Sequence, residues 1–285
     1  MFNDFEMMVR SIGDIPPVPA VAAKVLQLLQ DPTTSVKKLA DTIAHDPGTS
    51  ARILKLANSV YYGQQRNVTT LERAIILLGE IKVKNLVVET SLRGLNKSFH
   101  ALEKTLWEDS IGCASAARII AEHLESADSE EAFLAGLFRH LGKMVMLGCH
   151  PESYRHVLEI VAEGKGELVD VERAYFAYSH EKIGAALLDH WNFPPSLVQV
   201  TLHHHDLIFG ETEEEVRQLA AIVNLAGGLC ASLGIGRKSS AAEQSPIDTP
   251  GARMLTLSQE TLDEILADFQ QTFPRERDFF LVSAD

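Results

Sequence analysis

This sequence of 285 residues lacks long apolar runs, a leader-like N-terminus and any surplus of basic residues. The longest apolar stretches, such as Met144 to Leu147, are far shorter than the roughly 20 residues that a membrane-spanning helix needs. The N-terminus has no basic segment followed by an apolar one, so no signal peptide is expected. The sequence therefore predicts a cytoplasmic protein with no membrane partner.

Cysteines are also few. Cys113, Cys149 and Cys230 share no spacing typical of a metal or redox site, and we interpret them as reduced thiols. Acidic residues also outnumber basic ones: the sequence has 39 Asp and Glu and 26 Lys and Arg, which gives a net charge of −13. Because a field of that sign repels phosphate backbones, a nucleic-acid partner is not expected.

Apolar residues recur at helical spacing along nearly the whole chain, and no segment alternates for long enough to require a strand. Short helices are expected after Pro16–Pro19, from Thr34 or Ser35, from Thr49 or Ser50, and from Thr69, with Gly79 ending the last. Longer helices are expected over 102–125, 130–147, 151–162, 168–178, 180–191, 195–205 and 213–233. The sequence predicts an all-α, multi-helical fold.

Four regions follow from this pattern. They are an N-terminal helical subdomain over 1–100, a helical core over 101–235, a flexible linker over 236–255, and a C-terminal helix and tail over 256–285. The linker is predicted from its Ser, Ala, Gly and Pro content. The C-terminal helix is amphipathic and could dock into a groove of its own chain or of a partner; its apolar positions are Leu257, Leu262, Ile265, Leu266 and Phe269.

Two blocks of sequence carry a family resemblance. The first comprises Ile15–Pro19, Leu39-Ala40, Asp46-Pro47, Ala51–Ser59 and Ala74–Gly79. The second comprises Leu106-Trp107, Gly136–Lys143, His180 with Gly184 and Leu187-Leu188, Trp191–Pro194, and His204-His205. On these residues the stretch from Ile15 to about Asp206 resembles the HDOD domain, the HD-related output domain of bacterial signalling proteins. The resemblance implies a cytoplasmic helical signalling module, with a degenerate HD core and without established catalysis, whose partners vary between members.

The segment Gly136–Lys143 has the shape of the GLLHDIGK segment of metal-dependent HD phosphohydrolases, with Arg139-His140 in place of the His-Asp pair. The resemblance places the first metal-binding His of that superfamily on Asp109 or Ser110, and its late Asp on Gly227. Arg139 would bring a permanent cation to a metal position, and Gly227 offers no ligand atom. We therefore predict no catalytic residue and no required cofactor.

Other residues of the HD site are retained. Lys143 matches the family lysine that holds a phosphate or a metal-bound water, and His180 matches the His that opens an HxxxG helix. His204-His205-Asp206 resembles the HHE triplet of cyclic-dinucleotide phosphodiesterases, although Leu207–Gly210 departs from the Gly-Tyr-Pro hallmark that follows there. The candidate metal ligands are thus His140, His180, His204 and His205, and iron, nickel or zinc would suit them. The alternative is that they are remnants in a closed polar core.

The leading interpretation is a non-catalytic signal-transduction module that binds a signalling protein or a small regulator. A first alternative is a residual metal-dependent phosphohydrolase, phosphodiesterase-like, that uses Lys143 and the four histidines. A second is a DNA-binding regulator that reads DNA with the Thr49–Asn58 helix. Arg52 and Lys55 are the only cations of that helix, and its apolar residues favour a position in the core.

Overall fold

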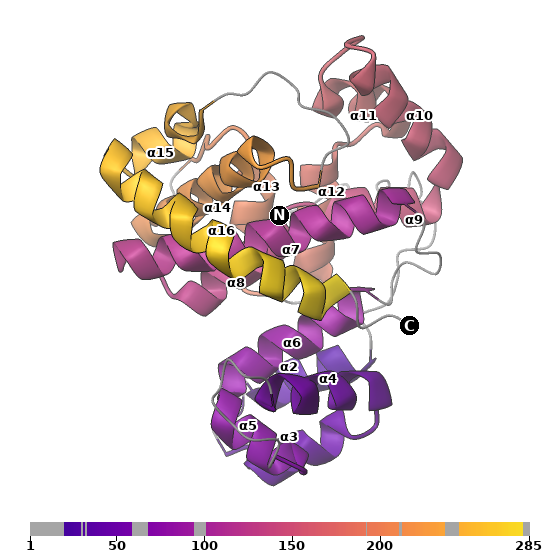
Figure 1. The fold of residues 1–285 in the computed structure, drawn as a ribbon. Helices are drawn as coiled ribbons and strands as arrows, with labels where there is room; N and C mark the ends of the chain where they lie inside the picture. Colours follow the sequence, from indigo (N-terminus) through magenta and orange to yellow (C-terminus); the bar gives the residue numbers. More distant parts are fainter. Residues whose placement is uncertain are drawn as a thin grey trace. The chain divides into compact units, whose positions relative to one another are not determined.

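The computed structural model describes residues 20–29, 31, 33–58, 68–93, 101–191, 193–210, 213–236 and 245–281. These residues form helices joined by turns, with no strand among them, so the all-α prediction is confirmed (Figure 1). The chain divides into two compact units, Pro16–Asn96 and a larger one that contains Lys97–Asp285. The Pro16–Pro19 motif lies outside the described residues.

The helices described in the smaller unit are α2 (Ala20–Leu29), α3 (Val36–Ile43), α4 (Pro47–Ala57), α5 (Leu71–Leu78) and α6 (Glu80–Arg93). Ser35, one of two predicted caps, accepts a hydrogen bond from the backbone N–H of Lys38. The cap of α5 is Thr70 and not the predicted Thr69, because the Thr70 side chain accepts the N–H of Arg73. Gly79 ends α5 with a φ of 85°, which lets the chain turn directly into α6.

Helix α4 is the predicted DNA-contacting helix, and its main cation is buried. Arg52 is 7% exposed and donates to the Glu89 carboxylate of α6 at 2.9 Å and to Thr90 Oγ1 at 3.2 Å. Ile53 and Ala57 of the same helix are fully buried. A guanidinium held in a buried ion pair is not at the surface to contact a phosphate. Arg52 therefore belongs to the core of the smaller unit.

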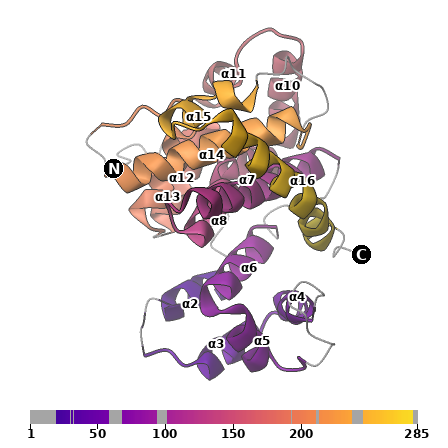
Figure 2. The ribbon, with the colours of Figure 1, turned by 60° about the vertical axis from the view of Figure 1, so that its left-hand side comes forward.

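In the larger unit, α7 (Ala101–Leu124) packs against α8 (Ser129–Phe138), α14 (Glu214–Ser232) and α16 (Gln259–Leu281) (Figure 2). Small buried residues at Ala114–Ala117 let neighbouring helices approach α7 closely. The other helices of this unit are α9 (Leu141–Cys149), α10 (Pro151–Ala162), α11 (Leu168–Phe176), α12 (His180–His190), α13 (Pro195–His203) and α15 (Pro250–Met254). Helix α7 thus forms the centre of the unit that holds the candidate site.

One long helix was predicted over 130–147, and the structure has two. The stretch Ser129–Cys149 is apolar and long enough to resemble a membrane span, but 89% of it is buried inside the protein, as in a core helix. It breaks between Arg139, which ends α8, and His140, which precedes α9. In an unbroken helix adjacent side chains point about 100° apart. The break instead lets both residues reach one carboxylate, Asp109.

The linker predicted over 236–255 is wrong for its second half. Residues 237–244 lie outside the described part of the chain, but Pro246–Asp248 form a 3₁₀ turn and Pro250–Met254 form α15. Thr249 caps α15, and the Gly251 N–H donates to Asn224 Oδ1 of α14 at 2.9 Å. The prolines that favoured a linker occupy the first turns of these helices, where a missing N–H costs nothing.

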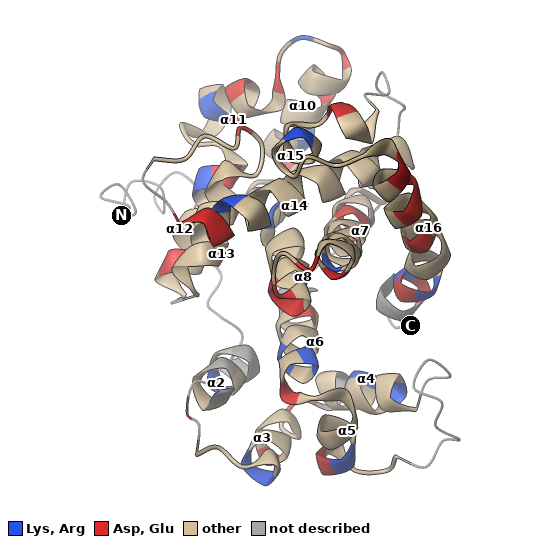
Figure 3. Cartoon of the chain, turned by 90° about the vertical axis from the view of Figure 1, so that its left-hand side faces the viewer, with Lys and Arg blue, Asp and Glu red and all other residues tan. Residues whose placement is uncertain are grey.

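The C-terminal helix, α16, docks on its own chain. Its buried positions face α7, and the side chains of Arg118 and Glu276 form an ion pair between the two helices. Figure 3 marks several acidic residues along α16, of which Glu260, Asp263 and Glu264 are exposed. The buried residues are Leu262, Ile265, Phe269 and Phe273. Residues 259–281 are therefore part of the larger unit and not a separate tail.

Candidate functional site

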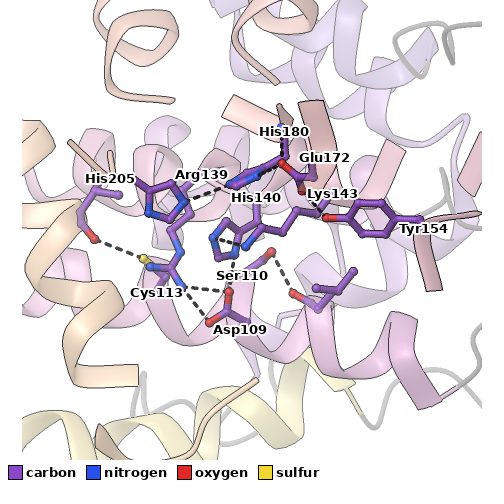
Figure 4. Close-up of polar contacts among 12 residues, drawn as sticks. Asp109, Ser110, Cys113, Arg139, His140, Lys143, Tyr154, Glu172, His180 and His205 are labelled. Carbon is purple, nitrogen blue, oxygen red and sulfur yellow. Dashed lines mark hydrogen bonds and ion pairs between the residues drawn. The ribbon is translucent and has the colours of Figure 1, made fainter. Parts of the chain in front are cut away.

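The break between α8 and α9 builds one half of the site around Asp109 of α7 (Figure 4). Arg139 Nη2 donates to both Asp109 oxygens, at 2.8 and 2.9 Å, and His140 Nδ1 contacts Asp109 Oδ2. All three residues are more than nine-tenths buried. Ser110 turns away and donates to the Leu106 carbonyl. Of the two residues onto which the resemblance placed the first metal-binding His, only Asp109 therefore lies at the site.

Gly227 of α14 makes room for the arginine. A Cβ at this position would lie 1.9 Å from Arg139 Nη1, so the guanidinium occupies the space that a side chain at 227 would need. Burial alone would lower the pKa of Arg139, but the groups around it, the Asp109 carboxylate first among them, together raise it. The site thus contains a permanent buried cation where the HD resemblance places a metal ion.

A second cation, Lys143, lies one helical turn beyond His140. Its Nζ is 2.9 Å from His140 Nε2, and burial lowers its pKa to about 8. His140 Nδ1 faces the Asp109 carboxylate, so that nitrogen carries the proton and Nε2 accepts from Lys143. Both ring nitrogens of His140 are therefore engaged.

The other half of the site begins at α12, which α9 approaches closely at Gly142. A Cβ on Gly142 would lie 2.0 Å from the His180 carbonyl oxygen, so only glycine fits between the helices. His180 is fully buried, and its Nδ1 lies 2.7 Å from Glu172 Oε2. Glu172 of α11 also accepts the His180 backbone N–H at 2.8 Å and the Tyr154 hydroxyl at 2.8 Å. Burial raises the pKa of Glu172, while its hydrogen-bond donors lower it.

His204 and His205 complete the cluster from the end of α13. His204 is 2% exposed, and its Nδ1–H donates to the Thr201 carbonyl at 2.8 Å. His205 Nε2 lies 3.1 Å from His180 Nε2, and His205 is the exposed member of the four. One ligand atom from each histidine falls within 4.8 Å of the others; these residues are His140, His180, His204 and His205.

Burial keeps these imidazoles neutral. It lowers the pKa of His140, His180 and His204 well below the ordinary value, and lowers that of His205 to about 2. The charges of Lys143 and Arg139 act in the same direction on three of them. A neutral imidazole retains a lone pair, which is the form that ligates metal ions.

All four predicted histidines thus converge, and Arg139, Gly227 and Lys143 lie beside them as the resemblance implied. His203 does not join them, since its ring packs on Phe209. Sequence reasoning missed Tyr154 and Glu172. A carboxylate at position 172 on the buried face of α11, directly after Val171, was the available signal.

The model of the HDOD domain family matches residues 15–207. Solved structures with the same fold include an HDOD domain protein of unknown function from Geobacter sulfurreducens, 22% identical, with a TM-score of 0.79 over 97% of this chain and 95% of that one. A conjectured phosphohydrolase from Shewanella amazonensis SB2B is 21% identical, with a TM-score of 0.73 over 97% and 98%. A conjectured signal transduction protein from Marinobacter aquaeolei VT8 is 18% identical, with a TM-score of 0.70 over 98% and 64%.

Among curated proteins, an uncharacterised one from Treponema pallidum (strain Nichols) is 24% identical over 216 residues. These residues are 75% of this chain and 42% of the relative, so the chain spans less than half the length of that relative.

Proposed function

Because the chain belongs to the HDOD family, we propose that it is a non-catalytic signal-transduction module that binds a signalling protein or a small regulator. The observation that carries the proposal is the buried Arg139–Asp109 ion pair, with the guanidinium in the space above Gly227. This ion pair lies at positions where the HD resemblance places metal ligands, which supports a non-catalytic role. The name of the Marinobacter structure agrees with a signalling role, and a cytoplasmic location is part of the proposal.

The chemistry of HD-type hydrolysis explains why this ion pair matters. Such a site needs a divalent metal that turns water into hydroxide near neutral pH. A guanidinium has five donors and no lone pair to offer a metal, and it stays charged at every physiological pH. Asp109 accepts from Arg139 and contacts His140, so its oxygens are already engaged. Asp109, the carboxylate that could bind the metal, therefore pairs with Arg139 and His140 instead.

A hydrolysis assay tests the proposal. Full-length, untagged protein is incubated with bis(p-nitrophenyl) phosphate and with a cyclic dinucleotide, in the presence of Mn²⁺, Fe²⁺, Ni²⁺ or Zn²⁺. We expect no rate above that of the metal ion alone. Metal-dependent hydrolysis by the wild type would overturn the non-catalytic proposal, provided that His204→Gln abolishes it and His156→Gln does not. His156 is a suitable control because it is an exposed histidine on α10.

The residual phosphohydrolase is the second candidate, and one observation favours it. Lys143 and the four histidines still converge, although they come from distant parts of the chain: Lys143 from α9, His140 from the break before it, His180 from α12, and His204 and His205 from the end of α13. Under this alternative Lys143 would contact a phosphate, so Lys143→Met would abolish turnover. Under the non-catalytic proposal there is no turnover to lose.

The DNA-binding alternative is weakened by the buried position of Arg52. It predicts an affinity for duplex DNA that falls steeply with salt. We expect no change in the fluorescence anisotropy of a labelled duplex, even at low salt.

A further inference from the structure

Three histidines of the cluster are held in one orientation by acceptors on their Nδ1 side. Glu172 accepts from His180, the Thr201 carbonyl faces His204 Nδ1, and Asp109 faces His140 Nδ1. A nitrogen that faces a carboxylate or a carbonyl carries the ring proton, so the Nε2 lone pair points the other way. Metal-binding histidines are typically oriented by such acceptors behind the ring. Nε2 is therefore the nitrogen through which each of these three rings could bind a metal ion, and one ligand atom from each lies within 4.8 Å of the others.

One of these lone pairs has no protein partner, and a second is paired only with another ring of the cluster. Among the described residues, His204 Nε2 is buried without a hydrogen-bond partner. The Nε2 atoms of His180 and His205 lie 3.1 Å apart, and His180 can only accept there because Nδ1 holds its proton. A buried acceptor without a donor, as at His204 Nε2, is unfavourable, and a bound cation would offset that cost.

From this geometry we propose that His180, His204 and His205 form a binding site for one divalent first-row transition-metal ion of the zinc, nickel or iron class. The proposed ligands are histidines alone, and the ion would not use Arg139, Asp109 or Gly227, whose ion pair does not fit a metal. This site goes beyond the proposed function and stands without it, since three neutral imidazoles bind such an ion whether or not any reaction follows.

The spacing of the ligand atoms suits a single ion. Two nitrogens on one tetrahedral zinc ion lie about 3.4 Å apart, given zinc–nitrogen distances near 2.1 Å. The 3.1 Å between His180 and His205 is close to this separation, and no ligand atom of the cluster lies more than 4.8 Å from another. The exposed side of His205 gives the ion a route from solvent.

His140 is a conditional fourth ligand, because Lys143 holds its Nε2 at 2.9 Å. A metal ion and an ammonium group compete for the same lone pair, and the positive charge of Lys143 also repels the ion. Replacing Lys143 with methionine removes both effects while filling a similar volume. The structure therefore assigns Lys143 a role in weakening metal binding.

The test is the affinity of chelator-treated, untagged full-length protein for Zn²⁺, measured by competition with a chromophoric chelator. The visible spectrum of the Co²⁺-substituted protein reports the coordination geometry. We expect one ion per chain and a tetrahedral Co²⁺ spectrum. His180→Gln, His204→Gln and His205→Gln should each weaken binding at least tenfold, and His156→Gln should leave it unchanged. Lys143→Met should tighten it. Thermal melting confirms that each variant is folded.

Two results would overturn the proposal. One is wild-type protein that takes up less than about a tenth of an equivalent of metal. The other is folded His204→Gln protein that binds as tightly as the wild type, which would locate the ion elsewhere. If Lys143→Met left the affinity unchanged, the competition at His140 would be refuted.

Discussion

The guanidinium of Arg139 lies 1.9 Å from the position that a Cβ at residue 227 would occupy, and it donates to both oxygens of Asp109. Each of these residues depends on the others for its packing or its charge. An arginine at 139 needs the space that glycine leaves at 227, and Asp109 needs the arginine because a buried carboxylate without a partner is costly. Together the three residues form a closed, buried ion pair.

The three buried histidines, His140, His180 and His204, make the stability of the metal-free protein depend on pH. Their pKa values are lowered in the folded state, so below the unfolded value of about 6.5 the unfolded chain binds more protons. Stability is therefore present above pH 6.5 and decreases as the pH falls below it, by up to about 1.4 kcal/mol per pH unit for each histidine. Urea unfolding between pH 7.5 and about 5, with chelator present, measures this slope.

The contribution of one histidine is isolated by comparison with His204→Gln. This variant should lose less stability than the wild type as the pH falls, because it has one fewer group to protonate on unfolding. The exposed residue His156 serves as the control, and His156→Gln should keep the wild-type slope. Equal slopes for all three proteins would contradict the assignment.

At the scale of single elements, the break between α8 and α9 and the contact between α9 and α12 position the site. The break places Arg139 and His140 at Asp109. The contact at Gly142 then places the first turn of α9, with Lys143, against the start of α12.

Gly142→Ala tests that contact. The added Cβ would meet the His180 carbonyl oxygen at 2.0 Å, and a backbone atom cannot move aside without shifting the helix. We expect a loss of about 1–3 kcal/mol in the free energy of unfolding, as for other overpacked positions. Gly210→Ala is the matched control, because its added Cβ meets nothing within 4 Å. An equal effect of the two substitutions would show that α9 and α12 are not tightly packed here.

Apolar periodicity predicted several helices well. The helices over 151–162 and 180–191 were predicted to within a residue of the observed ends. The break at Arg139 was missed because residues 132–147 are buried on every side, so no exposed face gives a period that could reveal a bend. The helix at Pro250–Met254 was missed because its five residues are too few to show an apolar period, although Thr249 caps it and α14 packs against it.

For the larger unit as a whole, the C-terminal helix is a structural component of the fold. Phe269 of α16 is fully buried, and Arg118 of α7 pairs with Glu276. The sequence predicted the amphipathic helix but left open whether it docks on its own chain or on a partner. The amphipathic pattern shows that the apolar face of the helix must be buried, but it does not show whether its own chain or a partner buries it.

Phe269→Ala should therefore destabilise the larger unit by about 3–5 kcal/mol, the usual cost of removing a buried aromatic side chain. Met254→Ala, at a residue that is 44% exposed, should cost far less. The measurement is urea unfolding followed by circular dichroism. A small effect of Phe269→Ala would mean that α16 detaches readily and that its apolar face is available to a partner.

Convergence of the histidines from separate helices could be predicted only through the family resemblance. Periodicity places His180 and His204 on helices and gives no distance between them. Glu172 and Tyr154 went unnoticed because a buried carboxylate cannot be distinguished from an exposed one until its donors are known.

The most direct test of the central claim is a double-mutant cycle of Arg139 and Gly227, measured by urea unfolding. In the wild type, Gly227→Ala must displace a guanidinium that Asp109 holds, so we expect a loss of about 1–3 kcal/mol. In an Arg139→Met background the displaced group is absent, and the cost should fall by at least about 1 kcal/mol. The same cost in both backgrounds would show that Arg139 does not occupy this space and would remove the structural basis for a closed, non-catalytic site.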